Sequence, residues 1–252
     1  MVSISPSTTE AVFAIGAGPE LVGRSRFCDY PPSVAKLPAV GGFVDASLEA
    51  ILGLTPTLVV GARGPGGRQI VDALEARGIA TYFPETESVA QIEGMIRGLG
   101  ERLAHGAAAA ALIADMQQER AALTACVAGH ARRSVLMLFG LSPIVAAGPL
   151  GFSHEMLTMS GCDNVLARGE GRKAAYPTLS LEQVLAADPD VVLVTAAMGE
   201  APRLPSTWDS LRAVSAGDVR FLPGDEVLRP GPRLARGQRA IVAAVFPSAI
   251  LP

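Results

Sequence analysis

Few side chains in this sequence stand at the spacings that catalysis requires. The glycine-rich stretch 61–68 lies between a predicted strand and a predicted helix, which is the position of a phosphate-binding loop. It lacks the Gly-Lys-Ser/Thr ending, and Pro65 removes a backbone N–H that would bind phosphate. The three histidines lie in unrelated segments without a second ligand at metal spacing, and no GxSxG nucleophile elbow occurs. We therefore expect no catalytic residue, no metal site and no enzyme activity, with a nucleotide-dependent enzyme as the remote alternative.

Two tyrosine–proline pairs, Tyr30-Pro31 and Tyr176-Pro177, favour a different chemistry, the binding of a flat apolar ring. Aromatic faces hold an apolar macrocycle well, and a few placed polar groups then fix its orientation. A tyrosine before a proline can also begin a turn with its ring at the edge of the core. The two pairs precede two copies of one segment, and this similar placement favours the ligand-facing role.

The repeated segment runs from Ser47 to Val59 and again from Ser180 to Val192, at a constant offset of 133 residues and with six identities. Each copy predicts a short helix that is N-capped by serine, ends before a proline and is followed by a buried strand. A repeat at about half the chain length predicts two similar lobes, since a solenoid would need a period of about 20–50 residues.

A strong helix is predicted between the two copies, from Ala107 to Ala128, where five consecutive alanines precede apolar residues at helical spacing. A helix of about 20 residues is a rod about 30 Å long, and we expect it to bridge the lobes. Alternating strand and helix patterns predict mainly parallel sheets. The expected fold is thus α/β, with two Rossmann-like lobes joined by one long helix. Its parts are an N-terminal lobe (1–105), the bridging helix (106–130) and a C-terminal lobe (131–252).

Open parallel sheets bind ligands in the loops at the carboxyl ends of their strands. The segments expected to form such loops are Ser5–Thr9, Phe27–Pro32, Gly41–Asp45, Gly61–Gly67, Leu141–Phe152, Ala174–Pro177 and Asp225–Arg233.

Composition excludes several classes of protein. The 252 residues are 49% hydrophobic and 18% charged, with a net charge of −3 and no run of lysine and arginine, so we expect no nucleic-acid partner. No apolar stretch reaches the ~18 residues that would cross a bilayer. The three cysteines are widely spaced and indicate neither a CxxC site nor a disulfide framework, although one bridge stays open. The size suits a stable monomer.

Several segments resemble the helical-backbone (class III) substrate-binding proteins of bacterial ABC importers, and among these the cobalamin binders. The family also includes haem and iron–siderophore binders. The segments that carry the resemblance are Ser3–Glu10, Cys28–Pro32, Leu37–Phe43, the two Ser-Leu-Glu repeats, Tyr176–Ser180 and Asp225–Arg233. The resemblance implies capture of a corrinoid (cobalamin or cobinamide) between the lobes and delivery to an ABC permease dimer in the inner membrane, without a catalytic cofactor. It also implies a periplasmic protein or extracytoplasmic lipoprotein, whose signal segment is not present in this chain.

The resemblance assigns roles residue by residue. Tyr30 and Tyr176 would pack on the corrin, Phe43 would line the cleft, and Asp225 and Arg229 would meet the corrin's amide side chains. Val145 and Ala62 fall near positions where the family carries aromatic residues. The ligand-binding residues expected in this sequence are Tyr30, Phe43, Arg63, Val145, Tyr176, Asp225 and Arg229.

Two other ligands stay open. In a haem binder the Tyr30 phenolate would be the axial iron ligand, and Gly64-Pro65 resembles the loops of haem binders. A siderophore binder would place several cations around an anionic iron chelate, for which the sequence offers Arg24, Arg26, Arg63 and Arg229.

Glu49 and Glu182 occupy the same position of the two repeats. By resemblance to the family they dock the two lobes onto arginines of the permease dimer. Equivalent carboxylates suit a two-fold symmetric partner, and charge complementarity sets orientation and association rate more than affinity. A glutamate in the first turn of a helix also stabilises the helix dipole by ~0.3–1 kcal/mol.

Overall fold

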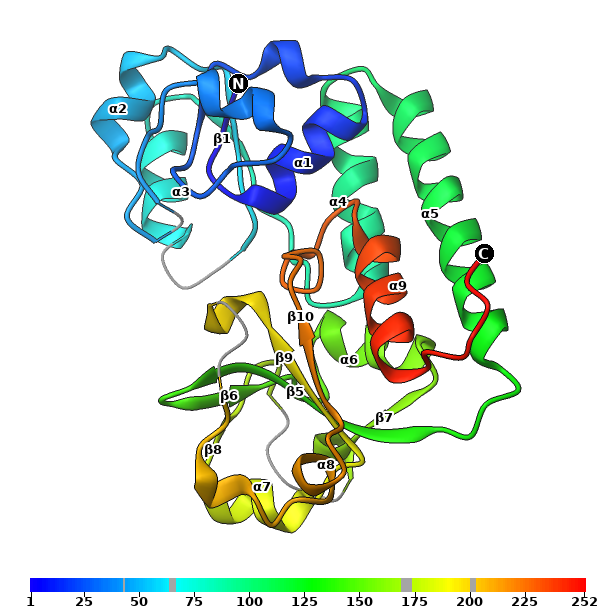
Figure 1. Cartoon of the computed structure of the whole chain (residues 1–252). Coiled ribbons are helices and arrows are strands. Elements are labelled where there is room, and N and C mark those ends of the chain that lie inside the picture. Colours follow the sequence, from blue (N-terminus) through cyan, green and yellow to red (C-terminus); the bar gives the residue numbers. More distant parts are fainter. Residues whose placement is uncertain (43, 64–66, 169–173, 200–202) are drawn as a thin grey trace. The chain divides into compact units, whose positions relative to one another are not determined.

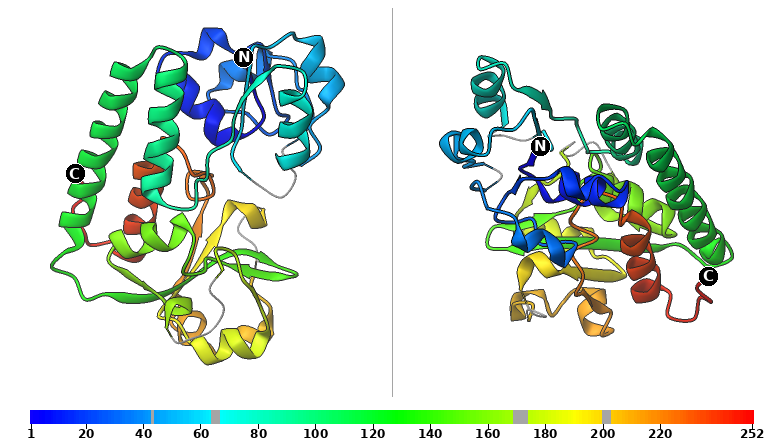
Figure 2. Two further views of the ribbon diagram at one scale, coloured as in Figure 1. Left: turned by 180° about the vertical axis from the view of Figure 1, so that it is seen from behind. Right: turned by 90° about the horizontal axis from the view of Figure 1, so that it is seen from above.

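In the computed structural model the chain forms two compact units, Met1–Asp115 and Met116–Pro252 (Figure 1). The boundary lies within helix α5 (Gly106–Val127), which Figure 2 shows in green as one continuous rod. The helix predicted for residues 106–130 thus begins at Gly106 and ends at Val127; the division into two lobes and a bridge stays a prediction. The structure describes residues 1–42, 44–63, 67–168, 174–199 and 203–252.

The first unit, in its described residues, holds a wholly parallel sheet with the strand order β2-β1-β3-β4. The central strand β1 pairs with both neighbours, Val2 lying opposite Gly23 on one side and Val59 on the other. Ile4 and Ile51 extend the buried apolar cluster around Val2 and Val59. The strands are β1 (Val2–Ser3), β2 (Gly23–Arg24), β3 (Leu58–Val60) and β4 (Ala80–Tyr82).

The helices of this unit follow local signals in the sequence. Helix α4 (Val89–Arg102) begins with a capping box in which Ser88 and Gln91 satisfy each other's backbone N–H groups, and it buries Ile92, Ile96 and Leu99 on one face. The other helices described in this unit are α1 (Pro6–Ala14), η1 (Gly18–Glu20), η2 (Pro32–Lys36), α2 (Leu48–Gly53) and α3 (Gly67–Glu75).

The second unit is built on a larger sheet, with the order β10-β9-β5-β6-β8 in the described residues and β7 paired to β5. The pairs β5–β7, β5–β9 and β9–β10 are parallel, whereas the pairs β5–β6 and β6–β8 are antiparallel. The prediction of mainly parallel sheets is therefore confirmed, with an antiparallel extension at one edge. The strands are β5 (Arg133–Leu141), β6 (Ile144–Ala146), β7 (Cys162–Asn164), β8 (Thr178–Leu179), β9 (Val191–Thr195) and β10 (Val219–Leu222).

Helices cover both faces of this sheet, α6 and α9 on one side and α7 and α8 on the other (Figure 1). Burial on both faces explains why β5 carries the continuous apolar run from Val135 to Leu138 rather than an alternating pattern. The helices are α6 (Phe152–Met159), η3 (Val165–Ala167), α7 (Leu181–Ala187), η4 (Ala196–Met198), η5 (Ser206–Trp208), α8 (Arg212–Ser215) and α9 (Leu234–Val245).

The repeated segment forms the predicted helix–turn–strand unit in both places. Ser47 accepts a hydrogen bond from the Ala50 N–H (3.2 Å) at the start of α2, and Ser180 accepts one from the Gln183 N–H (3.3 Å) at the start of α7. The strands β3 and β9 follow. These local signals are confirmed because they depend on residues only a few positions apart.

None of the helices in the described part of the chain is long and apolar enough to cross a membrane.

Candidate functional site

The first segment expected as a loop, Ser5–Thr9, is in fact the start of helix α1. Ser5 is the N-cap and Pro6 follows it, a combination that favours the first turn of a helix, and the side chains of Ser5, Thr8 and Thr9 are all buried. The loop prediction was wrong here because Ser and Pro, which are common in turns, were serving as helix-start signals.

These buried hydroxyls form a network at the carboxyl end of β1. The Ser3 and Thr8 hydroxyl oxygens lie 2.8 Å apart, and so do those of Ser5 and Thr8. The Thr9 hydroxyl lies 2.8 Å from the Ser3 hydroxyl and 3.1 Å from the Cys28 sulfur. Buried polar groups are costly unless they are paired, so these mutual contacts are what allow the hydroxyls to be buried.

The network, comprising Ser3, Ser5, Thr8, Thr9, Ser25 and Cys28, connects three carboxyl-end segments of the sheet. Ser25 lies 3.3 Å from the Cys28 sulfur on the segment after β2, and the Ala62 N–H donates to the Ser5 hydroxyl (3.0 Å) from the segment after β3. In a parallel sheet these segments emerge at one edge. The network thus fixes, through side chains, the backbone on which Tyr30 and Arg63 stand.

The predicted ligand residues of the first unit lie at this edge. Tyr30 is half-buried. Arg63 is exposed and forms a 2.8 Å ion pair with Glu85. Phe43 lies outside the described residues. Ala62, where the resemblance implies an aromatic residue, is buried.

Arg26 and Asp45 join two loops near the same edge by a 2.8 Å ion pair. The hydrogen bond from the Arg26 side chain lowers the pKa of Asp45. Both side chains are exposed, so the pair contributes little to the stability of the fold.

In the second unit, Tyr176 packs its ring edge-on against Phe139 of β5, with the ring centroids 5.5 Å apart. Tyr176 keeps 44% of its surface exposed, an unusual exposure for a large aromatic side chain. Val145 is partly buried on the neighbouring strand β6, opposite Gly140. The sequence analysis did not predict that Phe139 contacts Tyr176, because Phe139 belongs to an apolar run that indicates only a buried strand.

The structure brings Asp225 and Arg229 together and adds Arg233, which was not among the expected ligand-binding residues. Asp225 accepts from Arg229 (2.8 Å) and from Arg233 (2.7 Å), and Glu226 lies 3.8 Å from Arg233. The side chains of Arg229 and Arg233 are only 15% and 9% exposed. The spacing of four residues from Asp225 to Arg229 and from Arg229 to Arg233 was the available signal for this cluster.

Glu49 and Glu182 occupy the second helical position of α2 and α7, and both are exposed. A side-chain hydrogen bond involving Ser180 lowers the pKa of Glu182, which therefore keeps its negative charge to lower pH than an ordinary glutamate. Each carboxylate is thus presented to solvent at the start of a repeat helix.

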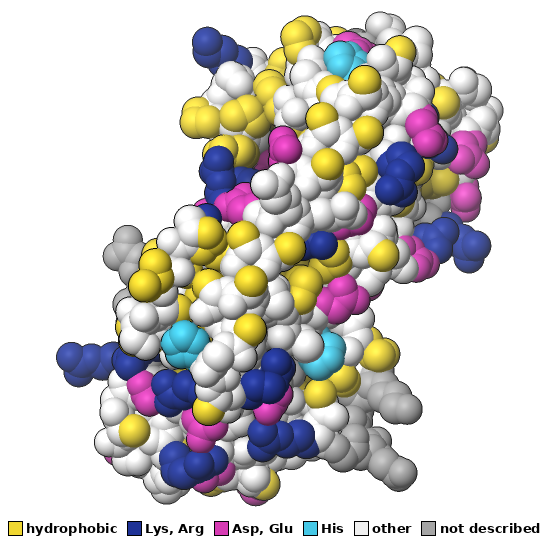
Figure 3. Space-filling view, turned by 90° about the vertical axis from the view of Figure 1, so that its right-hand side faces the viewer, with side chains coloured by type: hydrophobic (Ala, Val, Ile, Leu, Met, Phe, Trp, Pro, Cys, Tyr) yellow, Lys and Arg dark blue, Asp and Glu magenta, His cyan; other side chains and the backbone are white. Residues whose placement is uncertain are grey.

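The described residues contain no group of three or more His, Cys, Asp or Glu side chains placed to hold a metal ion. Burial raises the pKa of the Cys162 thiol to about 12, so this sulfur stays protonated rather than nucleophilic. On the face drawn in Figure 3, cations and anions are interspersed on the second unit, in keeping with ion pairs such as Arg132–Asp163 (2.6 Å).

Two α/β units, with a repeated helix–turn–strand segment and with aromatic and polar side chains on loops beside the strands, are typical of a two-lobed carrier of a small ligand. The chain belongs to the periplasmic binding protein family, whose model matches residues 1–226.

Within that family, the chain is 31% identical over 245 residues to the vitamin B12-binding protein of Salmonella typhimurium, covering 97% of this chain and 89% of that one. Its fold matches the vitamin B12-binding protein BtuF of Vibrio cholerae with a TM-score of 0.84 and 25% identity, over 96% and 94% of the two chains. It matches the apo haem-binding protein RhuT of Roseiflexus sp. RS-1 with a TM-score of 0.85 and 26% identity, over 99% and 98%.

Proposed function

We propose that this protein is the substrate-binding component of an ABC importer that captures a corrinoid in the periplasm and delivers it to a membrane permease. The observation that carries the proposal is the pair of tyrosines, Tyr30 and Tyr176, each at least partly exposed on a loop of a different unit. The 31% identity to a vitamin B12-binding protein over nearly the whole chain supports a corrinoid as the ligand.

The chemistry of these side chains suits binding without reaction. Aromatic rings offer faces to a flat macrocycle, and the Arg229 guanidinium, held by Asp225, is a fixed donor for peripheral amide oxygens. A role as a carrier requires no nucleophile, acid or base.

Haem is the second candidate, favoured by the likeness to a haem-binding protein at a TM-score of 0.85. Tyr30 would then ligate the iron through its phenolate. A siderophore is less favoured, because the candidate arginines are already engaged: Arg26, Arg63 and Arg229 pair with carboxylates, and Arg24 donates to the Ser25 and Ala35 carbonyls.

Titration of the purified protein with cobinamide, cobalamin and haem distinguishes these ligands. We expect corrinoid binding far tighter than millimolar, and a loss of about tenfold in affinity on Tyr30→Ala or Tyr176→Ala, because a ring contact is worth ~1.4 kcal/mol. Tyr30→Phe keeps the ring, so corrinoid affinity should be retained, whereas an axial haem ligand would be lost and the Soret band would shift. The control is Tyr82→Phe, which changes the one tyrosine of the sequence that is not assigned to the ligand and that lies in β4. If neither cobinamide nor cobalamin bound more tightly than millimolar, the corrinoid assignment would be refuted.

The exposed glutamates supply the proposed contact with the permease. For Glu49→Gln with Glu182→Gln, we expect slower association with the permease in proteoliposomes and a weaker dependence of that rate on salt, with ligand affinity unchanged. Glu101→Gln, at an exposed position of α4, is the matched control. An association rate equal to that of this control would contradict the docking role.

A further inference from the structure

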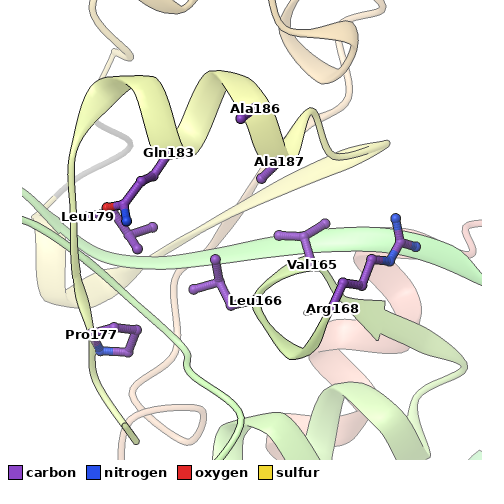
Figure 4. Close-up of a pocket in the computed structure, with 8 residues that line it drawn as sticks. All are labelled: Val165, Leu166, Arg168, Pro177, Leu179, Gln183, Ala186 and Ala187. Atoms are coloured by element: carbon purple, nitrogen blue, oxygen red, sulfur yellow. The ribbon is translucent and has the colours of Figure 1, made fainter. Parts of the chain in front are cut away.

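A pocket of about 410 Å³ lies entirely within the second unit, between helix α7 and the 3₁₀ helix η3 (Figure 4). None of the residues assigned above to ligand binding or docking lines it. Its lining residues are Val165, Leu166, Arg168, Pro177, Leu179, Gln183, Ala186 and Ala187.

The pocket has a buried apolar floor and open walls. Val165 and Leu179 are buried, at 5% and 9% exposure, whereas Gln183 and Ala186 on α7 are exposed. Ala186 and Ala187 have small side chains, and they leave space beside α7 that longer side chains would fill. A volume of this size lies within the range of small-molecule sites, which are mostly apolar with a few placed polar groups.

The two polar residues stand at opposite ends of the pocket. Figure 4 shows Gln183 and Pro177 at one end and Arg168 at the other. The side-chain amide oxygen of Gln183 (Oε1) accepts a hydrogen bond from the Ser180 N–H (2.9 Å) in the capping box of α7, and this bond fixes the Gln183 side chain at the edge of the pocket. The Arg168 side chain is 60% exposed.

Among the described residues, Arg168 shares its carboxylate partner with a second arginine. Asp163 lies 3.9 Å from Arg168 and is engaged at 2.6 Å by Arg132. Within the part of the chain that the structure describes, two guanidinium groups thus face one carboxylate beside an apolar pocket. A guanidinium in this position favours a carboxylate, to which it can donate two parallel hydrogen bonds.

We propose that this pocket binds a small amphiphilic carboxylate, with its hydrocarbon body on Val165, Leu179 and the alanines of α7 and its carboxylate on Arg168. The site is independent of the proposed macrocycle site, since it is formed within one unit by other residues. Such a ligand would bind to the carrier as a second, separate molecule.

Titration with octanoate, followed by the methyl NMR signals of Val165, Leu166 and Leu179, tests the proposal. We expect saturable shifts of these signals with a dissociation constant below about 1 mM. Octanol, which lacks the charge, and acetate, which lacks the hydrocarbon body, should each bind at least tenfold more weakly. Arg168→Gln should weaken octanoate binding about tenfold, as expected for the loss of one charge-assisted contact, and Ala186→Trp, which fills the pocket, should abolish it.

The controls separate this site from nonspecific binding and from the proposed function. Arg97→Gln removes an exposed arginine of the first unit and should leave octanoate affinity unchanged. Corrinoid affinity should be the same in Ala186→Trp as in the unaltered protein, which also shows that this variant is folded. Equal binding of octanol and octanoate, shifts confined to other methyl groups, or no saturable binding would each overturn the proposal.

Discussion

Replacing Asp225 by asparagine should lower the free energy of unfolding of the second unit by about 3 kcal/mol, the lower end of the range for breaking a buried ion pair. Asp225 forms ion pairs with two arginines, Arg229 and Arg233, and Arg233 keeps only 9% of its side chain exposed. The neighbouring Glu226 carboxylate lies 3.8 Å from Arg233, farther than the 2.7 Å of the Asp225 pair. Because Asp225 itself is 33% exposed, the effect should fall short of that of a fully buried pair.

Urea unfolding followed by tryptophan fluorescence measures this effect selectively. The single tryptophan, Trp208, is 2% exposed in the core of the second unit, so its emission reports the unfolding of that unit. Asp209→Asn, at an exposed neighbouring position, is the matched control and should unfold at the midpoint of the unaltered protein. If Asp225→Asn also unfolded at that midpoint, the cluster would not have the structural role assigned to it.

Replacing Gly148 by alanine should displace the loop that carries Tyr176. A Cβ at this position would lie 1.9 Å from the Ala174 carbonyl oxygen and 2.6 Å from the Pro177 ring, so the loop must move. Overpacking of this kind costs about 1–3 kcal/mol. We expect a lower stability of the second unit and, since Tyr176 would shift on Phe139, a corrinoid affinity reduced about tenfold.

The matched control is Gly129→Ala, in the same unit, because a Cβ there meets no atom within 4 Å. It should be neutral or slightly stabilising, through the reduced entropy of the unfolded chain. Corrinoid titration of both variants, at a temperature where both are folded, separates affinity from stability. Unchanged affinity in Gly148→Ala would show either that the loop adapts without moving the tyrosine or that Tyr176 does not contact the ligand, and would contradict this prediction.

The elements that the sequence predicted well depend on neighbouring residues. The two repeat helices, the strands after them and the long helix from Gly106 follow from capping serines, prolines and alanine-rich periodicity. The placement of Tyr30 and Tyr176 on loops also follows from the prolines beside them.

What the sequence could not supply depends on residues far apart in the chain. The Thr9–Cys28 and Ser5–Ala62 contacts join segments separated by 19 and 57 positions, and nothing local marks those hydroxyls as partners. The same applies to the pocket between α7 and η3, because its lining residues lie in or beside η3, β8 and α7, which are separate elements of the chain. Tertiary pairing, rather than propensity, decides these features.

The buried hydroxyl network also determines where new ligand preferences could be introduced into this protein. Its hydroxyls pair with one another and, on neighbouring segments, with the Cys28 sulfur and the Ala62 N–H, so a single apolar replacement would leave a buried partner unsatisfied. The Tyr30 loop is consequently a poor place to vary sequence in a library of altered binders. Directed evolution towards another cargo should instead begin at exposed or partly exposed positions such as Arg63, Val145 and Tyr176, where side chains can change without disrupting a shared set of hydrogen bonds.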